Sequence, residues 1–365
     1  MYAEMDGREC HEWRRRAFVR AYSPASNLNH VDEPAAARLS MRPLLALLLA
    51  AAFLAAAPVR AGPVTHEACE DAATPVPFAA NPRDLENLHF HEGKLFVTGA
   101  DAKLHAFASD ETDTVVADLG ARSGAMVTGA DGALHVRVGS ADVWRFPGDG
   151  THTVVATGLA GANGMAVDAA GNLYVSDEPT GRIYKLPVGS PASWTVWTRL
   201  EGPNGLVADD ARGVLWTVLT TDGRSSVVAL SLADASVVDE IPLTFGAFSL
   251  NVFWPFSDFS HPPVAVHGAS DPTSPVLFKA LDDLTLAPDG RLYVAAWMPG
   301  EILRVDPTTR AACVVASGFA QPSSVRIASG FGAFDGDLFV TDFGGHAQLV
   351  TDTPQDGHVS RVPLG

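Results

Sequence analysis

Four residues with oxygen-bearing side chains occupy the same place in a segment that repeats along the chain. When the repeats are aligned on a turn glycine, these residues are Glu86, Asn163, Asn204 and Asp282. Two carboxylates and two amide oxygens that converge on one point suit a hard divalent cation, and their two negative charges would balance the ion. The pattern therefore predicts a metal site. For each residue alone an alternative stays open, because Asn-Gly pairs are common in tight turns and an acid at a strand entrance is often merely solvated.

The repeat is clearest over residues 162–177, which read A-N-G-M-A-V-D-A-A-G-N-L-Y-V-S-D. We interpret this stretch as an Asn-Gly turn, an alternating strand, a turn at Gly171 and a second strand. Further copies begin at Leu85, Ser123, Pro203 and Leu281. The first leading positions, Glu86, Gly124, Asn163 and Asn204, are 38, 39 and 41 residues apart. Each unit continues into more alternating strands, and four strands per unit of this length indicate a β-propeller blade.

The number of blades follows from the spacing. A sixth unit starts near Pro322, and the chain ends on H-V-S-R-V-P-L, which is predicted as an outer strand. The step from Asn204 to Asp282 is 78 residues, about twice the repeat. We expect a single all-β, six-bladed propeller over 84–365 with an insertion at 245–280, and the alternative is a seventh, degenerate blade there. Residues that open the innermost strands of a propeller converge near one end of its central channel.

The first part of the chain reads as a targeting segment. Residues 41–61 contain an apolar run after Arg42, followed by small residues that could form a cleavage site. This pattern is typical of a secretory signal peptide. Residues 1–40 are then expected to come from a start codon assigned too far upstream, and the alternative is a genuine N-terminal tail. Residues 62–83 are expected to form an N-terminal arm. The apolar run is too short to span a bilayer, so we expect no membrane span and an exported protein, periplasmic or secreted.

Charge and cysteine content narrow the class further. The formal net charge of the whole chain is -17, which disfavours nucleic-acid partners. Of the three cysteines, Cys10 precedes the signal, so Cys69 and Cys313 remain for the exported chain. These two either form one disulfide that ties the arm to a late repeat or stay separate buried thiols. No serine-hydrolase elbow, zinc-protease motif, phosphate loop or dinucleotide fingerprint is present.

At the four leading residues the chain resembles the senescence marker protein / gluconolactonase family, also called regucalcin-like, of six-bladed propellers. The resemblance covers about 85–364 and implies one divalent cation held by Glu86, Asn163, Asn204 and Asp282, with Asp282 also acting as general base. The family's Asp-Gly on the fifth blade is Asp282-Asp283 here. This pair is closer to the Asp-Asn of the related paraoxonases, so Asp283 is a candidate additional ligand, although the paraoxonase histidine pair has no counterpart.

These observations lead to two functional hypotheses. The first is a metal-dependent hydrolase of a lactone or small ester that uses Ca²⁺, with Zn²⁺, Mg²⁺ and Mn²⁺ as alternatives. The second is a non-catalytic propeller that serves as a ligand- or protein-binding scaffold. The side chains of Trp216, Trp297, His135 and Arg137 are expected near the channel mouth, mostly in structural roles. The sequence does not define the oligomeric state.

Overall fold

The computed structural model describes residues 66–80, 85–220, 225–243, 281–297, 299–343 and 357–364. The predicted start segment 1–40, the signal peptide 41–61 and the insertion 245–280 lie outside these ranges, so those interpretations stay predictions. No helix among the described residues is long and apolar enough to cross a membrane.

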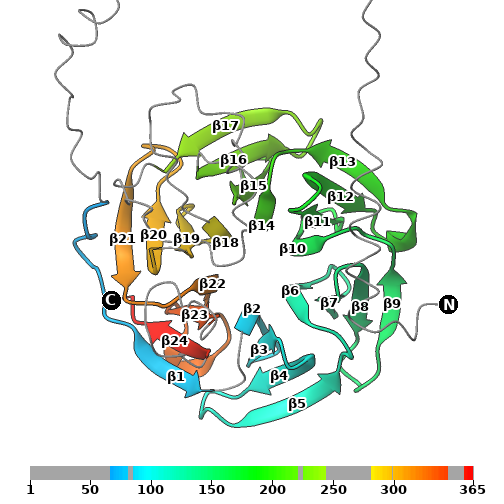
Figure 1. Cartoon of the computed structure of the whole chain (residues 1–365), viewed down its shortest axis with the longest axis horizontal. Coiled ribbons are helices and arrows are strands. Elements are labelled where there is room, and N and C mark those ends of the chain that lie inside the picture. The colour runs from blue at the N-terminus through cyan, green and yellow to red at the C-terminus, as the bar shows by residue number, and fades with distance from the viewer. Residues whose placement is uncertain are drawn as a thin grey trace, which may run out of the picture. The chain divides into compact units, whose positions relative to one another are not determined.

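The described strands form six four-stranded antiparallel sheets, arranged as blades around a common centre (Figure 1). Blade 1 contains β2 (Leu85–His91), β3 (Lys94–Gly99), β4 (Lys103–Phe107) and β5 (Asp113–Asp118). Blade 2 contains β6 (Ser123–Thr128), β7 (Leu134–Val138), β8 (Asp142–Phe146) and β9 (Thr153–Ala156). Blade 3 contains β10 (Ala162–Val167), β11 (Leu173–Asp177), β12 (Arg182–Leu186) and β13 (Thr195–Arg199). The predicted six-bladed propeller is confirmed.

The second half of the ring repeats this plan. Blade 4 contains β14 (Pro203–Asp209), β15 (Val214–Leu219), β16 (Ser226–Ser231) and β17 (Val237–Pro242). Blade 5 contains β18 (Leu281–Leu286), β19 (Leu292–Ala296), β20 (Glu301–Val305) and β21 (Ala312–Ser317). Blade 6 contains β22 (Pro322–Ile327), β23 (Leu338–Asp342), β24 (His358–Val362) and, from the other end of the chain, β1 (Val76–Ala80). Short 3-10 turns occur at η1 (Pro191–Ser193) and η2 (Gly332–Phe334).

The N-terminal arm closes the ring. The outermost strand of blade 6 is β1, which pairs antiparallel with β24, so the prediction that the chain's last segment is an outer strand was wrong: β24 is the third strand. Just before β1, a disulfide joins Cys69 to Cys313 on β21, across 244 residues of sequence. The arm therefore holds blades 5 and 6 together, and the disulfide alternative is the one the structure adopts.

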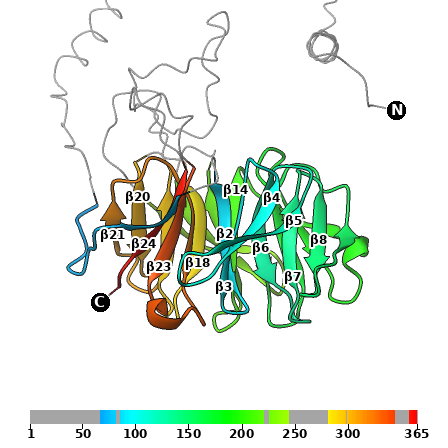
Figure 2. The same cartoon turned by 90° about the horizontal axis from the view of Figure 1, so that it is seen from below.

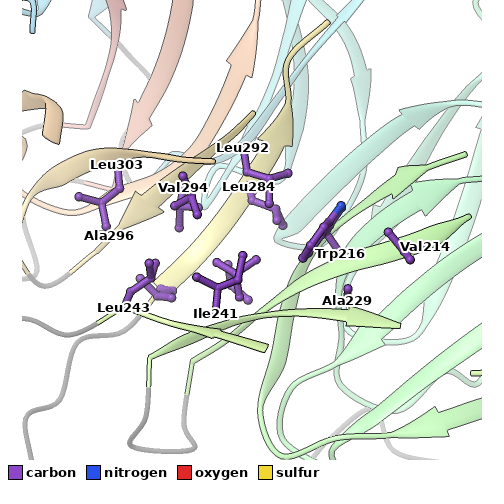
Figure 3. Packing of buried hydrophobic residues seen from close by; sticks show 14 residues of the cluster. Val214, Trp216, Ala229, Ile241, Leu243, Leu284, Leu292, Val294, Ala296 and Leu303 are labelled. Atoms are coloured by element: carbon purple, nitrogen blue, oxygen red, sulfur yellow. The ribbon is translucent and has the colours of Figure 1, made fainter. Parts of the chain in front are cut away.

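Packing between neighbouring blades supplies the hydrophobic core. Each buried cluster draws side chains from two adjacent blades, and in the example of Figure 3 Trp216 of β15 and Ile241 of β17 lie near Leu284 of β18 and Val294 of β19. The side view shows the strands of each blade running between the two faces of the ring (Figure 2). The alternation of apolar residues in each strand places them in these clusters, and leaves the strand ends at the faces for polar groups.

The innermost strand of every blade begins with a register irregularity. The pairing with the second strand shifts between Leu85 and Asn87, between Ala162 and Met165, and correspondingly in the other four blades. A bulge releases a residue from the regular ladder and re-aims its side chain. All the predicted ligands fall inside these irregular stretches.

Candidate functional site

The four predicted ligands lie near the starts of four of the six innermost strands, β2, β10, β14 and β18, and these strands border the centre of the ring in Figure 1. Two of them are in direct contact: the side-chain amide of Asn204 donates a 2.9 Å hydrogen bond to Oδ1 of Asp282. This bond joins blade 4 to blade 5 and leaves Oδ1 of Asn204 and Oδ2 of Asp282 outside it. The structure thus brings together residues that are 78 positions apart in the sequence.

Asp282 is surrounded by other carboxylates. Burial raises the pKa of Asp282 well above its usual value, and the negative charges of Glu86, Asp283 and Glu178 raise it further. The hydrogen bond from Asn204 acts in the opposite direction but does not compensate. Carboxylates packed this closely repel one another unless a proton or a cation joins them.

Glu178, which follows β11 on blade 3, was missed by the sequence analysis. Its pKa is raised by burial and by the charge of Glu86, and its side chain forms a hydrogen bond with Asn163. Glu178 comes directly after the repeated L-Y-V-S-D, so it belongs to the end of a second strand and not to the aligned leading positions. Because antiparallel neighbours reverse direction, the end of a second strand lies beside the start of the first, and this rule could have identified it.

Glu86 interacts both with the other carboxylates of the site and with an arginine. Its charge acts on Asp282 and Glu178, while its own Oε2 accepts a hydrogen bond from the guanidinium of Arg122. The Arg122 side chain is 45% exposed, and its guanidinium carbon lies 4.6 Å from the ring centroid of Phe343. An arginine therefore already neutralises one predicted ligand.

Asp283 is engaged in a different way from Asp282. Its Oδ2 accepts hydrogen bonds from the Ser324 hydroxyl and from Arg326 Nη1, the latter at 2.5 Å, and its Oδ1 accepts one from the Leu284 backbone at 2.8 Å. Oδ2 is thus engaged in a buried ion pair with blade 6, and Oδ1 is bound by the backbone of blade 5. The role of Asp283 as an additional ligand stays a prediction, and these contacts favour a positioning role.

The two Asn-Gly pairs do not form turns, so that interpretation was wrong. Gly164 and Gly205 lie within strands β10 and β14. A Cβ on Gly164 would come 2.3 Å from the Asn204 carbonyl oxygen, and one on Gly205 would come 2.5 Å from Cα of Asp283. The glycines are required because the next blade's inner strand approaches so closely.

Buried hydroxyl groups fix this approach. The Ser176 hydroxyl on β11 donates to the Asn204 carbonyl oxygen at 2.6 Å and accepts a hydrogen bond from the Gly164 amide at 2.8 Å. The Thr98 hydroxyl binds the Gly124 carbonyl at 2.9 Å in the same way between blades 1 and 2. At Asn204 and Gly124 the backbone of the leading residue is therefore held by the preceding blade.

Among the described residues, no group of three or more His, Cys, Asp or Glu side chains is arranged to hold a metal ion. The predicted set contains only two carboxylates and depends on amide oxygens, which are also ligands for hard cations. The oxygens of Asp282, Asn204, Glu178 and Asn163 and the excess negative charge around Asp282 fit such a cation. Of the other residues expected at the mouth, Trp216 is buried in the core between blades 4 and 5, and His135 bonds the Ala133 carbonyl.

Comparisons with solved structures agree with this architecture. A gluconolactonase from Xanthomonas campestris superposes with a TM-score of 0.58 at 15% identity, over 83% of this chain and 95% of the other. The chain shares the gluconolactonase fold. A calcium-binding regucalcin from Agrobacterium tumefaciens matches with a TM-score of 0.55 at 16% identity, over 80% of this chain and 96% of its own. The proteins that the sequence resembles are thus among its structural neighbours.

The same fold also carries a different activity. A streptogramin B lyase matches with a TM-score of 0.51 at 13% identity, over 80% of this chain and 97% of the lyase. No protein-family model and no curated protein sequence matches the chain. At these identities the comparisons define the fold, and the function has to be argued from the residues of the site.

Proposed function

We propose that the chain is a divalent-metal-dependent hydrolase of a lactone or small ester. The observation that carries the proposal is the concentration of negative charge around Asp282, which comes from Glu86 and Asp283 at the starts of innermost strands and from Glu178 after β11. Such a concentration of negative charge costs stability in the protein alone, and it is retained at sites that bind cations or do acid–base chemistry. The gluconolactonase and regucalcin folds support the same reading.

The cation would be held by Asp282, Asn204, Asn163 and Glu178, with Glu86 joining once Arg122 releases it. We expect Ca²⁺ because the oxygen donors are carboxylates and amides. When bound, such an ion supplies Lewis-acid polarisation of the lactone carbonyl. In this proposal Asp282 would act as the general base through Oδ2, because its Oδ1 already accepts the hydrogen bond from Asn204, which keeps the carboxylate in one orientation.

One observation favours the alternative, a binding scaffold without catalysis. The ion pair between Arg122 and Glu86 neutralises a predicted ligand without any metal. If this pair persists in solution when Ca²⁺ is added, the ring would have no full ligand set. The test must therefore measure metal binding as well as turnover.

The deciding experiment is hydrolysis of aldonolactones and aryl esters after chelation and again after Ca²⁺ is restored, alongside calorimetric titration of Ca²⁺. We expect activity that is lost with chelator, returns with Ca²⁺ and is absent in Asp282→Ala. Asp289→Ala, an exposed carboxylate 51% accessible on the same blade, is the matched control and should behave as wild type. Metal binding without hydrolysis would favour the scaffold, and unchanged Ca²⁺ binding in Asp282→Ala would contradict the site.

We also propose that the protein is exported to the periplasm or secreted. The support is the disulfide between Cys69 and Cys313, since such bonds form and persist mainly in oxidising compartments. Fractionation of cells that express the full chain tests this, and recovery of the protein with both thiols free in the cytosol would contradict it.

A further inference from the structure

The leading position of blade 2 has no side chain of its own, but a guanidinium occupies the space. A Cβ on Gly124 would come 1.6 Å from Nη2 and 2.5 Å from Cζ of Arg137. Arg137 thus reaches from β7, the second strand of the blade, to the place where blades 1, 3, 4 and 5 present Glu86, Asn163, Asn204 and Asp282. The ring of oxygen-bearing side chains is interrupted by a cation.

Arg137 is a buried cation without a full set of partners. Arg137 is 7% exposed, and its Nη1 donates to the Gly139 carbonyl oxygen, but its Nε has no hydrogen-bond partner among the residues that the structure describes. Burial lowers the pKa of Arg137, and the neighbouring charge of Arg122 lowers it further, while Glu86 raises it. A buried guanidinium donor left unpaired is costly, so its retention indicates a ligand that accepts the hydrogen bond.

Arg122 and Arg137 share one carboxylate, Glu86. Arg122 bonds it directly, and Arg137 interacts with it through charge. The blade 1 and 2 side of the site therefore has one positive charge in excess, whereas the side of blades 3 and 5 holds Glu178 and Asp282. The fourth carboxylate, Asp283, is matched by Arg326.

The net charge of the site becomes positive when a dication is bound. This connected set contains four carboxylates and three guanidiniums, so without a metal it carries one excess negative charge when all four carboxylates are ionised, and none when Asp282 holds the proton that its raised pKa favours. A dication at Asp282 would leave one positive charge unmatched. That charge would lie on the side of Arg122 and Arg137, where planar guanidiniums suit a carboxylate or a phosphate.

We propose that Arg122 and Arg137 form an anion subsite, and that the substrate is a lactone that carries a second, anionic group, a carboxylate or a phosphate. The inference rests on the proposed lactonase function and deepens it by naming the substrate class. The metal side of the site receives the lactone carbonyl, and the arginine side receives the anionic group. Arg122, which is exposed, exchanges Glu86 for the substrate when the cation takes Glu86.

The test measures binding of product-like ligands, so that it does not depend on turnover. Titration calorimetry in Ca²⁺ compares gluconate with glucarate, which adds a carboxylate, and with 6-phosphogluconate, which adds a phosphate. We expect glucarate or 6-phosphogluconate, each of which carries one anionic group more than gluconate, to bind about tenfold tighter than gluconate, the gain from one charge-assisted hydrogen bond. The ligand that binds more tightly of these two shows whether the subsite accepts a carboxylate or a phosphate.

Two variants and one control variant test where the subsite lies. Arg122→Gln removes the exposed charge, and Gly124→Ala keeps every charge but displaces the Arg137 guanidinium, at a position where the backbone of an ordinary residue is allowed. In both variants the affinity for glucarate and for 6-phosphogluconate should fall to within about twofold of the affinity for gluconate. Arg310→Gln, which removes an exposed ion pair with Asp239, is the control and should keep the wild-type preference. Far-ultraviolet circular dichroism checks folding.

Failure of this inference is distinguishable from failure of the proposed function. Equal binding of gluconate, glucarate and 6-phosphogluconate by the wild type, or an unchanged preference in Arg122→Gln and Gly124→Ala, would overturn the anion subsite even if neutral lactones are hydrolysed. A preference for the second anionic group that the variants abolish would uphold the subsite even if no lactone is hydrolysed, and would leave only the catalytic proposal overturned.

Discussion

Asn204 Nδ2 donates a 2.9 Å hydrogen bond to Asp282 Oδ1, and this bond connects the second residues of the two neighbouring inner strands β14 and β18. It fixes one oxygen of a carboxylate whose pKa is raised by burial and by Glu86, Asp283 and Glu178. The protein thus holds a carboxyl group in a defined orientation, in surroundings that disfavour its ionised form. Functional sites commonly keep such groups although they lower the stability of the folded protein.

Replacing Asp282 by Asn should stabilise the chelated protein. A carboxyl whose pKa is raised on folding destabilises the folded state above its unfolded pKa, so at pH 7 the neutral amide removes a penalty. We expect the melting temperature in chelator to rise by about 2–4 °C per kcal/mol gained. Added Ca²⁺ should raise the wild-type melting temperature but not that of Asp282→Asn. Asp289→Asn is the control, and an unchanged melting temperature in chelator would contradict the crowding argument.

The ion pair between Asp283 and Arg326 provides the second prediction. Both side chains are almost buried, at 4% and 13% exposure, and the Ser324 hydroxyl also binds Asp283. Arg326→Met should destabilise the protein by about 3–5 kcal/mol, because it leaves the Asp283 carboxylate buried without its cation. Chemical denaturation measures this loss.

The double variant distinguishes a positioning role of Asp283 from a ligand role. Asp283→Asn combined with Arg326→Met removes both charges and should recover much of the stability. If Asp283 only positions blade 5, the stable double variant binds Ca²⁺ nearly as well as wild type. Loss of Ca²⁺ binding in this folded variant would instead make Asp283 a ligand.

The third prediction concerns acid stability. Burial lowers the pKa of His89 to about 3, with further repulsion from Arg326 and His91, and the His89 ring shares the Thr128 hydroxyl with His91. Between pH 6.5 and about 3 the unfolded chain binds a proton that the folded protein excludes, so unfolding takes up protons and acid favours it.

The stability conferred by neutral His89 is therefore fully present above pH 6.5 and decreases as the pH falls, by at most about 1.4 kcal/mol per pH unit. His89→Gln keeps a hydrogen-bonding group for Thr128 but does not titrate. Denaturation curves at pH 7, 6, 5 and 4 should show a shallower loss in His89→Gln than in wild type. Parallel losses would show that His89 is not the responsible group.

The sequence predicted the ring because its repeat is local: each hairpin carries its own turn glycine and alternating apolar residues. The sequence could single out Glu86, Asn163, Asn204 and Asp282 as candidate ligands because they share one register in that repeat. Glu178 and Arg137 were missed or given only a structural role, because they reach the site from second strands, and their part depends on how neighbouring strands are placed. The pairing of β1 with β24 was also missed, since the sequence of residues 76–80 contains no feature that indicates which strand they pair with.

Removal of the disulfide should weaken the closure of the ring. Cys69 and Cys313 enclose 244 residues, and the arm that follows Cys69 supplies β1 to blade 6. A double Cys69→Ser, Cys313→Ser variant should lose about 2–5 kcal/mol, mainly because the unfolded chain regains the entropy of an open loop. Thermal melts of the oxidised wild type, the reduced wild type and the variant measure this, and the last two should agree. If the loss is confined to the arm, hydrogen exchange will increase in β1 and β24 while β10 and β14 stay protected, whereas a uniform increase would mean that the whole ring depends on this one covalent link.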